Sequence, residues 1–110
     1  AAGIATAFTV NGEPRPLSPQ VELTLYRAVQ EALTNVRKHA QARHAGVTLT
    51  YTAQEVRLKV TDDGIGSEMP TSNGFGLVGL RERVQLLGGE LHIASEVGEG
   101  FELELSLHEG

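Results

Sequence analysis

Residues 61–80, TDDGIGSEMPTSNGFGLVGL, contain two groups of glycines that are separated by a short polar segment. The first group follows the acidic pair Asp62 and Asp63, and the second, which includes Gly74 and Gly76, leads into a helical pattern. Glycine is common where the backbone takes positive φ or where another group approaches it closely. Free N–H groups and the positive end of a helix dipole favour an anion. The stretch therefore indicates a phosphate-binding loop.

The segments on either side of this stretch have strand patterns. Residues 47–52 and 56–61 alternate apolar and polar side chains, which predicts a hairpin with one buried face. Its second strand ends at Asp62, where a sheet usually presents ligand-binding loops. A helix is expected over 76–87, ended by the two glycines after it. Residues 91–93 and 101–107 alternate again and predict a closing hairpin.

The N-terminal part predicts a strand and a long helix. Residues 3–10 are rich in strand-forming side chains, and Asn11-Gly12 is a hairpin turn signal. The following residues 13–17 then form either a short edge strand or an extended linker. Ser18-Pro19 is typical of a helix start, and the apolar spacing continues to about residue 40.

One edge of this long helix carries polar groups of the kinds that are common in binding sites. Spacings of three and four residues bring Glu31, Asn35 and Lys38 together at the border of the apolar face, with His39 nearby. A carboxylate, an amide and an ammonium at such a border suit a binding site. The residues alone also fit a solvated helix edge whose basic C-terminal end is favoured by the dipole.

Composition limits the class of protein. The chain has 110 residues, enough for one domain with one core, and its 40% hydrophobic and 21% charged residues are ordinary for a soluble protein. The absence of cysteine excludes disulfides and thiolate metal sites. A net charge of −5 argues against nucleic-acid binding. We expect a cytoplasmic domain cut from a longer protein, with membrane anchoring of that parent left open.

The order of elements predicts the fold class. Strands, a long helix, a hairpin, a glycine loop, a helix and a final hairpin fit an α/β (α+β) two-layer sandwich. In it, a mixed, mostly antiparallel sheet is covered on one face by helices.

Each motif has another explanation when it is taken alone. Residues 74–79, GFGLVG, match the dinucleotide-binding glycine pattern, but no strand pattern precedes them and that interpretation is rejected. Asp62-Asp63-Gly64 lacks the alternating oxygen ligands of a calcium loop and is also compatible with a simple turn. The histidines have no metal-ligand spacing, and His92 is expected to be exposed.

Together the motifs are more specific. The series Glu31-x-x-x-Asn35-x-x-Lys38-His39, Asp62-x-Gly64-x-Gly66 and Gly74-x-Gly76-Leu77 resembles the ATP-binding domain of sensor histidine kinases. These belong to the GHKL superfamily, which has the Bergerat fold. The resemblance covers nearly all of residues 1–110. It is strongest to the branch with a short nucleotide lid, which signals to response regulators with a helix-turn-helix output.

The resemblance implies a role for each matched residue. Asp62 would accept a hydrogen bond from the adenine amino group, and Gly64 and Gly66 would let the base approach the backbone. Asn35 would be a magnesium ligand, Lys38 would contact a phosphate, and His39 would lie beside the nucleotide. Gly74, Gly76 and Leu77 would form the second glycine box, with residues 67–75 as the lid. Glu31 would orient or deprotonate the attacking histidine.

The function implied is binding of Mg²⁺–ATP and transfer of its γ-phosphoryl group to a histidine. That histidine would lie on a dimerisation domain absent from this chain, with a response regulator downstream. The fragment is expected to be monomeric, unable to phosphorylate itself, and part of a homodimeric kinase. Two alternatives stay open: a serine kinase of the anti-sigma-factor type, and a module that uses ATP only as a conformational switch.

Overall fold

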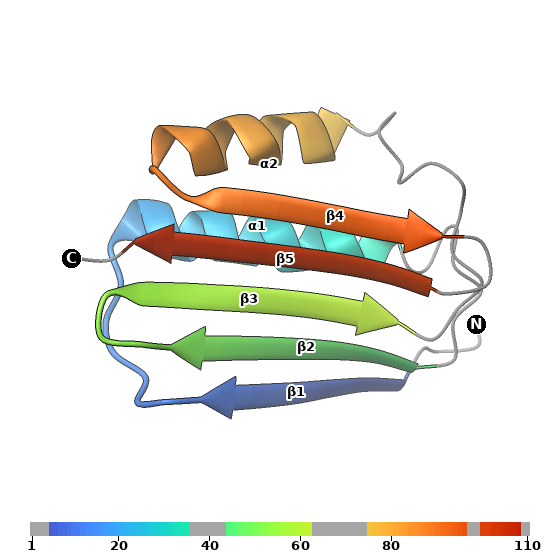
Figure 1. Ribbon diagram of the computed structural model, residues 1–110, viewed down its shortest axis with the longest axis horizontal. Helices are drawn as coiled ribbons and strands as arrows, with labels where there is room; N and C mark the ends of the chain where they lie inside the picture. The colour runs from blue at the N-terminus through green and yellow to red at the C-terminus, as the bar shows by residue number, and fades with distance from the viewer. Residues whose placement is uncertain (1–4, 36–43, 63–74, 97–99, 109–110) are drawn as a thin grey trace.

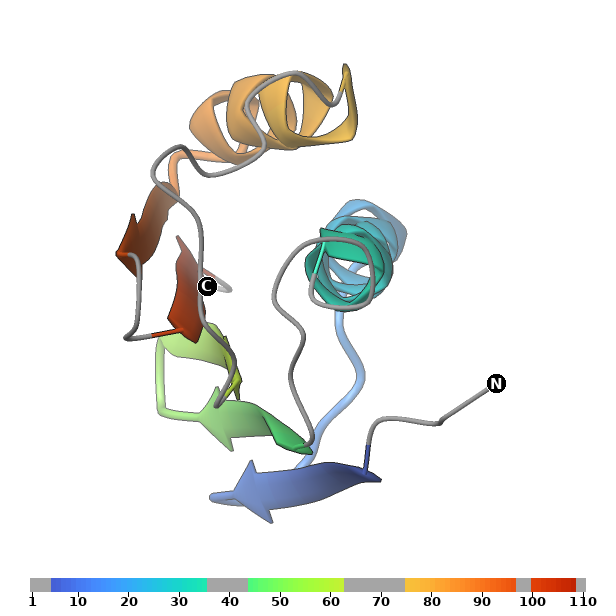
Figure 2. The same ribbon diagram turned by 90° about the vertical axis from the view of Figure 1, so that its right-hand side faces the viewer.

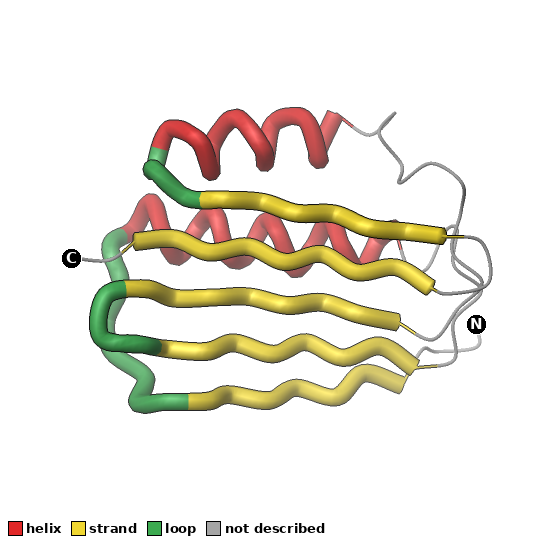
Figure 3. Tube along the Cα trace, in the orientation of Figure 1, coloured by secondary structure: helices red, strands yellow, loops and turns green. Residues whose placement is uncertain are grey.

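The computed structural model describes residues 5–35, 44–62, 75–96 and 100–108. Along the chain the elements are β1 (Ala5–Asn11), α1 (Pro19–Asn35), β2 (His44–Tyr51), β3 (Glu55–Asp62), α2 (Phe75–Leu86), β4 (Glu90–Glu96) and β5 (Gly100–His108). Figure 3 shows the strands side by side in one sheet. Neither described helix is both long and apolar enough to cross a membrane.

The two-layer architecture is confirmed. The five strands of the sheet are ordered β1-β2-β3-β5-β4, with β1 and β2 parallel and the other neighbours antiparallel. Both helices lie on the same side of the sheet (Figure 2). The sheet is therefore mixed and mostly antiparallel, with one face covered and the other open.

The hairpin predicted at Asn11-Gly12 is wrong. The first strand instead pairs in parallel with β2, from Ala5 opposite His44 to Asn11 opposite Thr50. Gly12, with φ of 80°, bends the chain away from the sheet, and residues 13–17 form the extended linker. A side chain at Gly12 would meet the carbonyl oxygen of Tyr51. The turn signal was correct about the bend but not about the strand pairing.

The linker is held against the β2–β3 turn by Arg15. Its Nη1 donates a hydrogen bond to the carbonyl of Thr52 at 2.7 Å, and its Nη2 donates to that of Glu55 at 3.4 Å. The guanidinium also lies 5.7 Å from the centre of the Tyr51 ring, within range of a cation–π contact. These contacts fix the path from β1 to the start of α1.

The first helix begins as predicted. The Ser18 hydroxyl accepts a hydrogen bond from the backbone N–H of Val21 at 3.4 Å, and Pro19 occupies the first helical position. The predicted end near residue 40 lies outside the described residues. The apolar spacing of the helix does form its buried face, with Ala28 and Ala32 fully buried. Thr24 is also buried, which the apolar pattern did not predict. Its hydroxyl donates a hydrogen bond to the carbonyl of Gln20 at 2.7 Å, so the buried donor is satisfied.

The core lies between α1, α2 and the central strands. Its largest fully buried side chains come from β3 and β5, with Leu58, Leu103, Leu105 and Leu107 at 1% exposure or less. Because β5 pairs with β3 on one side and β4 on the other, its leucines are enclosed from both flanks. The closing hairpin predicted from residues 91–93 and 101–107 is confirmed as β4 and β5, whereas the pairing of β5 with β3 was not predicted.

Candidate functional site

The segments that carry the predicted site converge on one end of the molecule. α1 ends, β3 ends and α2 begins at the right-hand end in Figure 1, and Figure 2 views that end directly. The opposite end holds the β2–β3 turn and the connection from α2 to β4. Residues far apart in the sequence thus reach the same edge of the fold.

Asp62 is the last residue of β3 and lies opposite Ala45 of β2. The residue is half-buried, and its Oδ2 atom is buried without a hydrogen bond from the described residues. The residue also has an interaction within the protein. A half-buried carboxylate favours a polar hydrogen-bond donor, because water competes less for it. The position at a strand end, predicted from the alternation of 56–61, is confirmed.

The polar edge of α1 is only partly described. Glu31 is half-buried on α1, and Asn35 is the last residue of α1 that the structure describes. The side chain of Asn35, and the whole of Lys38 and His39, lie outside what the structure describes. The helix direction nevertheless brings this edge to the same end of the molecule as Asp62.

The second glycine box is likewise split. Gly76 and Leu77 belong to the first turn of α2, which begins at Phe75. Gly64, Gly66 and Gly74 lie outside the described residues, as does most of the predicted lid at 67–75. The expected helix at Gly76 and Leu77 is therefore confirmed, whereas the glycine loops before it stay predictions.

The two helices present opposite polarity at this end. α2 points its N-terminal end toward this end of the molecule, and α1 points its C-terminal end toward it, so the helix dipoles are positive and negative there respectively. An anion is favoured beside the first and a cation beside the second. Among the described residues no group of histidine, aspartate and glutamate side chains could hold a metal on its own.

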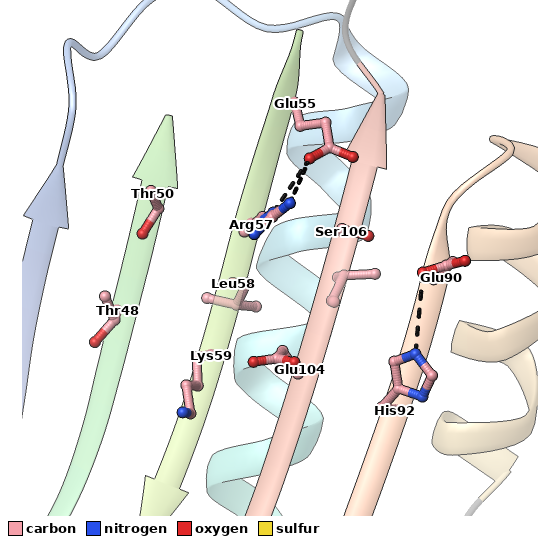
Figure 4. Close-up of a pocket in the computed structure, with 11 residues that line it drawn as sticks. Thr48, Thr50, Glu55, Arg57, Leu58, Lys59, Glu90, His92, Glu104 and Ser106 are labelled. Carbon is pink, nitrogen blue, oxygen red and sulfur yellow. Dashed lines mark hydrogen bonds and ion pairs between the residues drawn. The ribbon is translucent and has the colours of Figure 1, made fainter. Parts of the chain in front are cut away.

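A separate hollow of about 450 Å³ lies on the open face of the sheet (Figure 4). Its lining is mostly polar and comes from β2, β3, β5 and β4, with Thr48, Lys59, Glu104 and His92 forming one row across the strands. The sequence indicated that these side chains face solvent. It could not indicate that Lys59 and Glu104 are cross-strand neighbours, because that depends on β3 pairing with β5.

This hollow contains no residue of the predicted site. Arg57 in its lining forms an ion pair with Glu55 at 2.9 Å, and the His92 ring lies 4.0 Å from the Glu90 carboxylate. The His92 side chain is 74% exposed, as predicted. Exposed pairs of this kind are common on the solvent face of an antiparallel sheet. We therefore assign the candidate site to the end near Asp62 and not to the open face.

Comparison with known proteins gives a consistent family. The model of the histidine kinase-, DNA gyrase B-, and HSP90-like ATPases matches residues 20–110. The sensor histidine kinase LnrJ of Bacillus subtilis is 37% identical over 100 residues, which are 91% of this chain and 25% of LnrJ. The histidine-protein kinase/phosphatase DegS of Brevibacillus brevis is 36% identical over 107 residues, covering 96% of this chain and 28% of DegS.

A solved structure agrees with the sequence relatives. The histidine kinase domain of the blue-light-activated kinase EL346 from Erythrobacter litoralis superposes with a TM-score of 0.71 at 25% identity, covering 94% of this chain and 54% of that one. The chain spans about a quarter of the length of the curated relatives described above. The chain therefore belongs to the histidine kinase-, DNA gyrase B- and HSP90-like ATPases, as the GHKL ATPase domain of a sensor histidine kinase.

Proposed function

We propose that this domain binds Mg²⁺–ATP at the end of the sheet marked by Asp62 and donates the γ-phosphoryl group to a histidine on a separate dimerisation domain. The observation that carries the proposal is the meeting of three segments at that end: the last turn of α1, the end of β3 and the start of α2. Membership of an ATPase family supports ATP as the nucleotide.

The adenine end of the slot is assigned to Asp62. A carboxylate is only an acceptor and therefore suits the exocyclic amino group of adenine, which is a donor. The half-buried position of Asp62 strengthens such a bond, because water competes less for a partly enclosed carboxylate. Guanine has a carbonyl at the equivalent place and would be disfavoured. Gly64 and Gly66 would leave room for the base beside the backbone.

The phosphate end is assigned to the two helix termini. The N–H groups at the start of α2, near Gly76 and Leu77, favour the triphosphate. The amide oxygen of Asn35 suits Mg²⁺, which takes hard oxygen ligands and keeps several waters. Mg²⁺ would neutralise phosphate charge during transfer. Lys38 would add a positive charge on the same helix edge, with His39 beside the nucleotide.

In the transfer step, the nucleophilic nitrogen of the acceptor histidine forms a P–N bond as the bond between the β- and γ-phosphates breaks and ADP leaves. Glu31, half-buried on the edge of α1, is proposed to orient that histidine or take its proton. The acceptor would come from a dimerisation domain outside this chain, and the phosphoryl group would pass to a response regulator. The site would face the cytoplasm, where ATP is available.

Titration with ATP, monitored by thermal unfolding with Mg²⁺ and with EDTA, tests the proposal. We expect a concentration-dependent rise in melting temperature that is larger with Mg²⁺. Asn35→Ala should reduce the shift much more in Mg²⁺ than in EDTA. No shift with ATP would contradict nucleotide binding, and equal loss in both buffers would remove Asn35 from the metal site.

Transfer is tested separately. Radiolabelled ATP should label a histidine only when the dimerisation domain of the parent kinase is added, and the isolated chain should stay unlabelled. ATP binding without any phosphohistidine in the complete kinase would favour a nucleotide-operated switch over a kinase.

A further inference from the structure

The side chains on the helix-covered face of the sheet form rows across the strands, and the row nearest the candidate site differs from the row beside it. The row nearest the site consists of Thr6, Ala45 and Asp62. The next row inward consists of bulky apolar side chains, namely Phe8, Val47, Val60 and Leu103. The covered face therefore loses its bulk at the end where β2 begins and β3 ends (Figure 1).

Ala45 is the member of this row that lies directly opposite Asp62 in the antiparallel pair of β2 and β3. Opposite residues on one face of such a pair have Cβ atoms about 4.5–5.5 Å apart. Both side chains belong to the covered face, because Val47 and Val60, two positions further into the sheet, are fully buried. Ala45 is itself only 5% exposed. Its methyl group therefore lines enclosed space beside the Asp62 carboxylate.

The room beside this carboxylate depends on the size of residue 45. Protein interiors are close-packed, so a change of even one methylene is felt there. Alanine has only a methyl group, whereas a valine such as Val47 would extend two further carbons over the same face. A planar base whose amino group donates to Asp62 needs that room. The row thus combines a hydrogen-bond acceptor with a small neighbour, which suits a flat ligand with one polar edge.

We propose that Ala45 is a specificity-determining residue of the nucleotide site. Its methyl group contacts the amino edge of the base and restricts the site to adenine without a substituent on the amino nitrogen. This inference rests on the proposed binding of Mg²⁺–ATP beside Asp62. Asp62 selects an amino donor, and Ala45 selects the size of that donor. One methyl group at such a contact changes affinity by about 10–200-fold.

Isothermal titration calorimetry with the Mg²⁺ complexes of ATP and of N6-methyl-ATP tests the assignment. The unmodified chain should bind N6-methyl-ATP at least about tenfold more weakly than ATP. Ala45→Gly removes one methyl group from the protein where the analogue adds one, and should bring the two affinities to within about threefold of each other. Ala45→Val should weaken the binding of both nucleotides at least about tenfold.

A control variant separates loss of the site from loss of stability, because overpacking a buried position also destabilises the fold. Val56→Ile adds one carbon at a fully buried position of β3, opposite Tyr51 at the far end of the sheet. Both Val56→Ile and Ala45→Val should lower the melting temperature without nucleotide, but Val56→Ile should keep the ATP affinity of the unmodified chain. The preference for ATP over N6-methyl-ATP is a ratio within one variant, so a smaller folded fraction does not change it.

Two results would overturn the role of Ala45 and leave Mg²⁺–ATP binding in place. One is a preference for ATP over N6-methyl-ATP in Ala45→Gly that equals the preference of the unmodified chain. The other is an ATP affinity in Ala45→Val that equals the affinity of the unmodified chain. Absence of ATP binding to the unmodified chain would instead overturn the proposed function, and this inference with it.

Discussion

Two adjacent glycines after α2 provide a sharp test of the structure, because identical substitutions should fail for different reasons. Gly88 has φ of 72° and nothing within 4 Å of the place where a side chain would stand. Its N–H bonds to the carbonyl of Gln85 at 3.0 Å, and the N–H of Gly89 bonds to that of Val84 at 2.9 Å. This pair of bonds is the Schellman helix ending.

Gly89 is constrained by its neighbours. A Cβ there would lie 2.3 Å from the carbonyl oxygen of Ser106 and 2.7 Å from Cδ2 of Leu107. The first contact involves β5 backbone, which cannot move without disturbing the sheet. Gly88→Ala therefore costs only the left-handed conformation, about 1–2 kcal/mol. Gly89→Ala costs overpacking, at the upper end of about 1–3 kcal/mol or beyond it.

Urea unfolding of the two alanine variants measures this difference directly. In thermal unfolding, a loss of 1 kcal/mol in the free energy of unfolding lowers the melting temperature by roughly 4–8 °C for a domain near this size. Gly88→Asn should recover part of the loss, because asparagine tolerates the left-handed region, whereas Gly89→Asn should be worse than Gly89→Ala. A larger loss of stability in Gly88→Ala than in Gly89→Ala, or no gain from asparagine over alanine at position 88, would contradict this explanation.

Three further substitutions and one control, Leu86→Ala, test the fold. Arg15→Ala should lower the free energy of unfolding by about 1 kcal/mol in urea titrations, through lost hydrogen bonds to the β2–β3 turn; no change would contradict the anchoring role. Leu103→Ala, at a fully buried position, should cost about 2–5 kcal/mol, whereas Leu86→Ala should stay within about 0.5 kcal/mol in the same assay. Lys59→Gln removes the exposed ion pair with Glu102 at 3.6 Å and should change the free energy of unfolding by less than about 1 kcal/mol. A larger loss would mean that this ion pair contributes more than exposed pairs usually do.

Local patterns predicted the elements well. The capping pair Ser18-Pro19 identified the start of α1, and alternation identified both hairpins, because each signal depends on neighbours in the chain. Alternation gave the strand bounds less well, since β2 already includes His44 whereas the alternating pattern begins at residue 47. The parallel pairing with β1 extends β2 in that direction, and that pairing joins segments nearly forty residues apart.

The pairing of β1 could not be obtained from sequence pattern. Asn11-Gly12 has the local chemistry of a hairpin turn, yet the residues directly after it form a linker to α1 and not a second strand. The partner of an edge strand is chosen by long-range packing, which periodicity does not encode. The same holds for the site: the motifs named Asp62 and Glu31, but their arrival at one end of the fold depends on strand order and helix direction.

The central claim is that Asp62 forms part of an ATP site, and isothermal titration calorimetry with Mg²⁺–ATP tests it most directly. Asp62→Asn turns an acceptor oxygen into a donor and should weaken ATP binding at least about tenfold, since a hydrogen bond to a charged group contributes about 1.5–3 kcal/mol. Glu104→Gln removes the same charge from the open face and should leave the affinity unchanged. Equal affinity for ATP in Asp62→Asn and the unmodified chain would contradict the account.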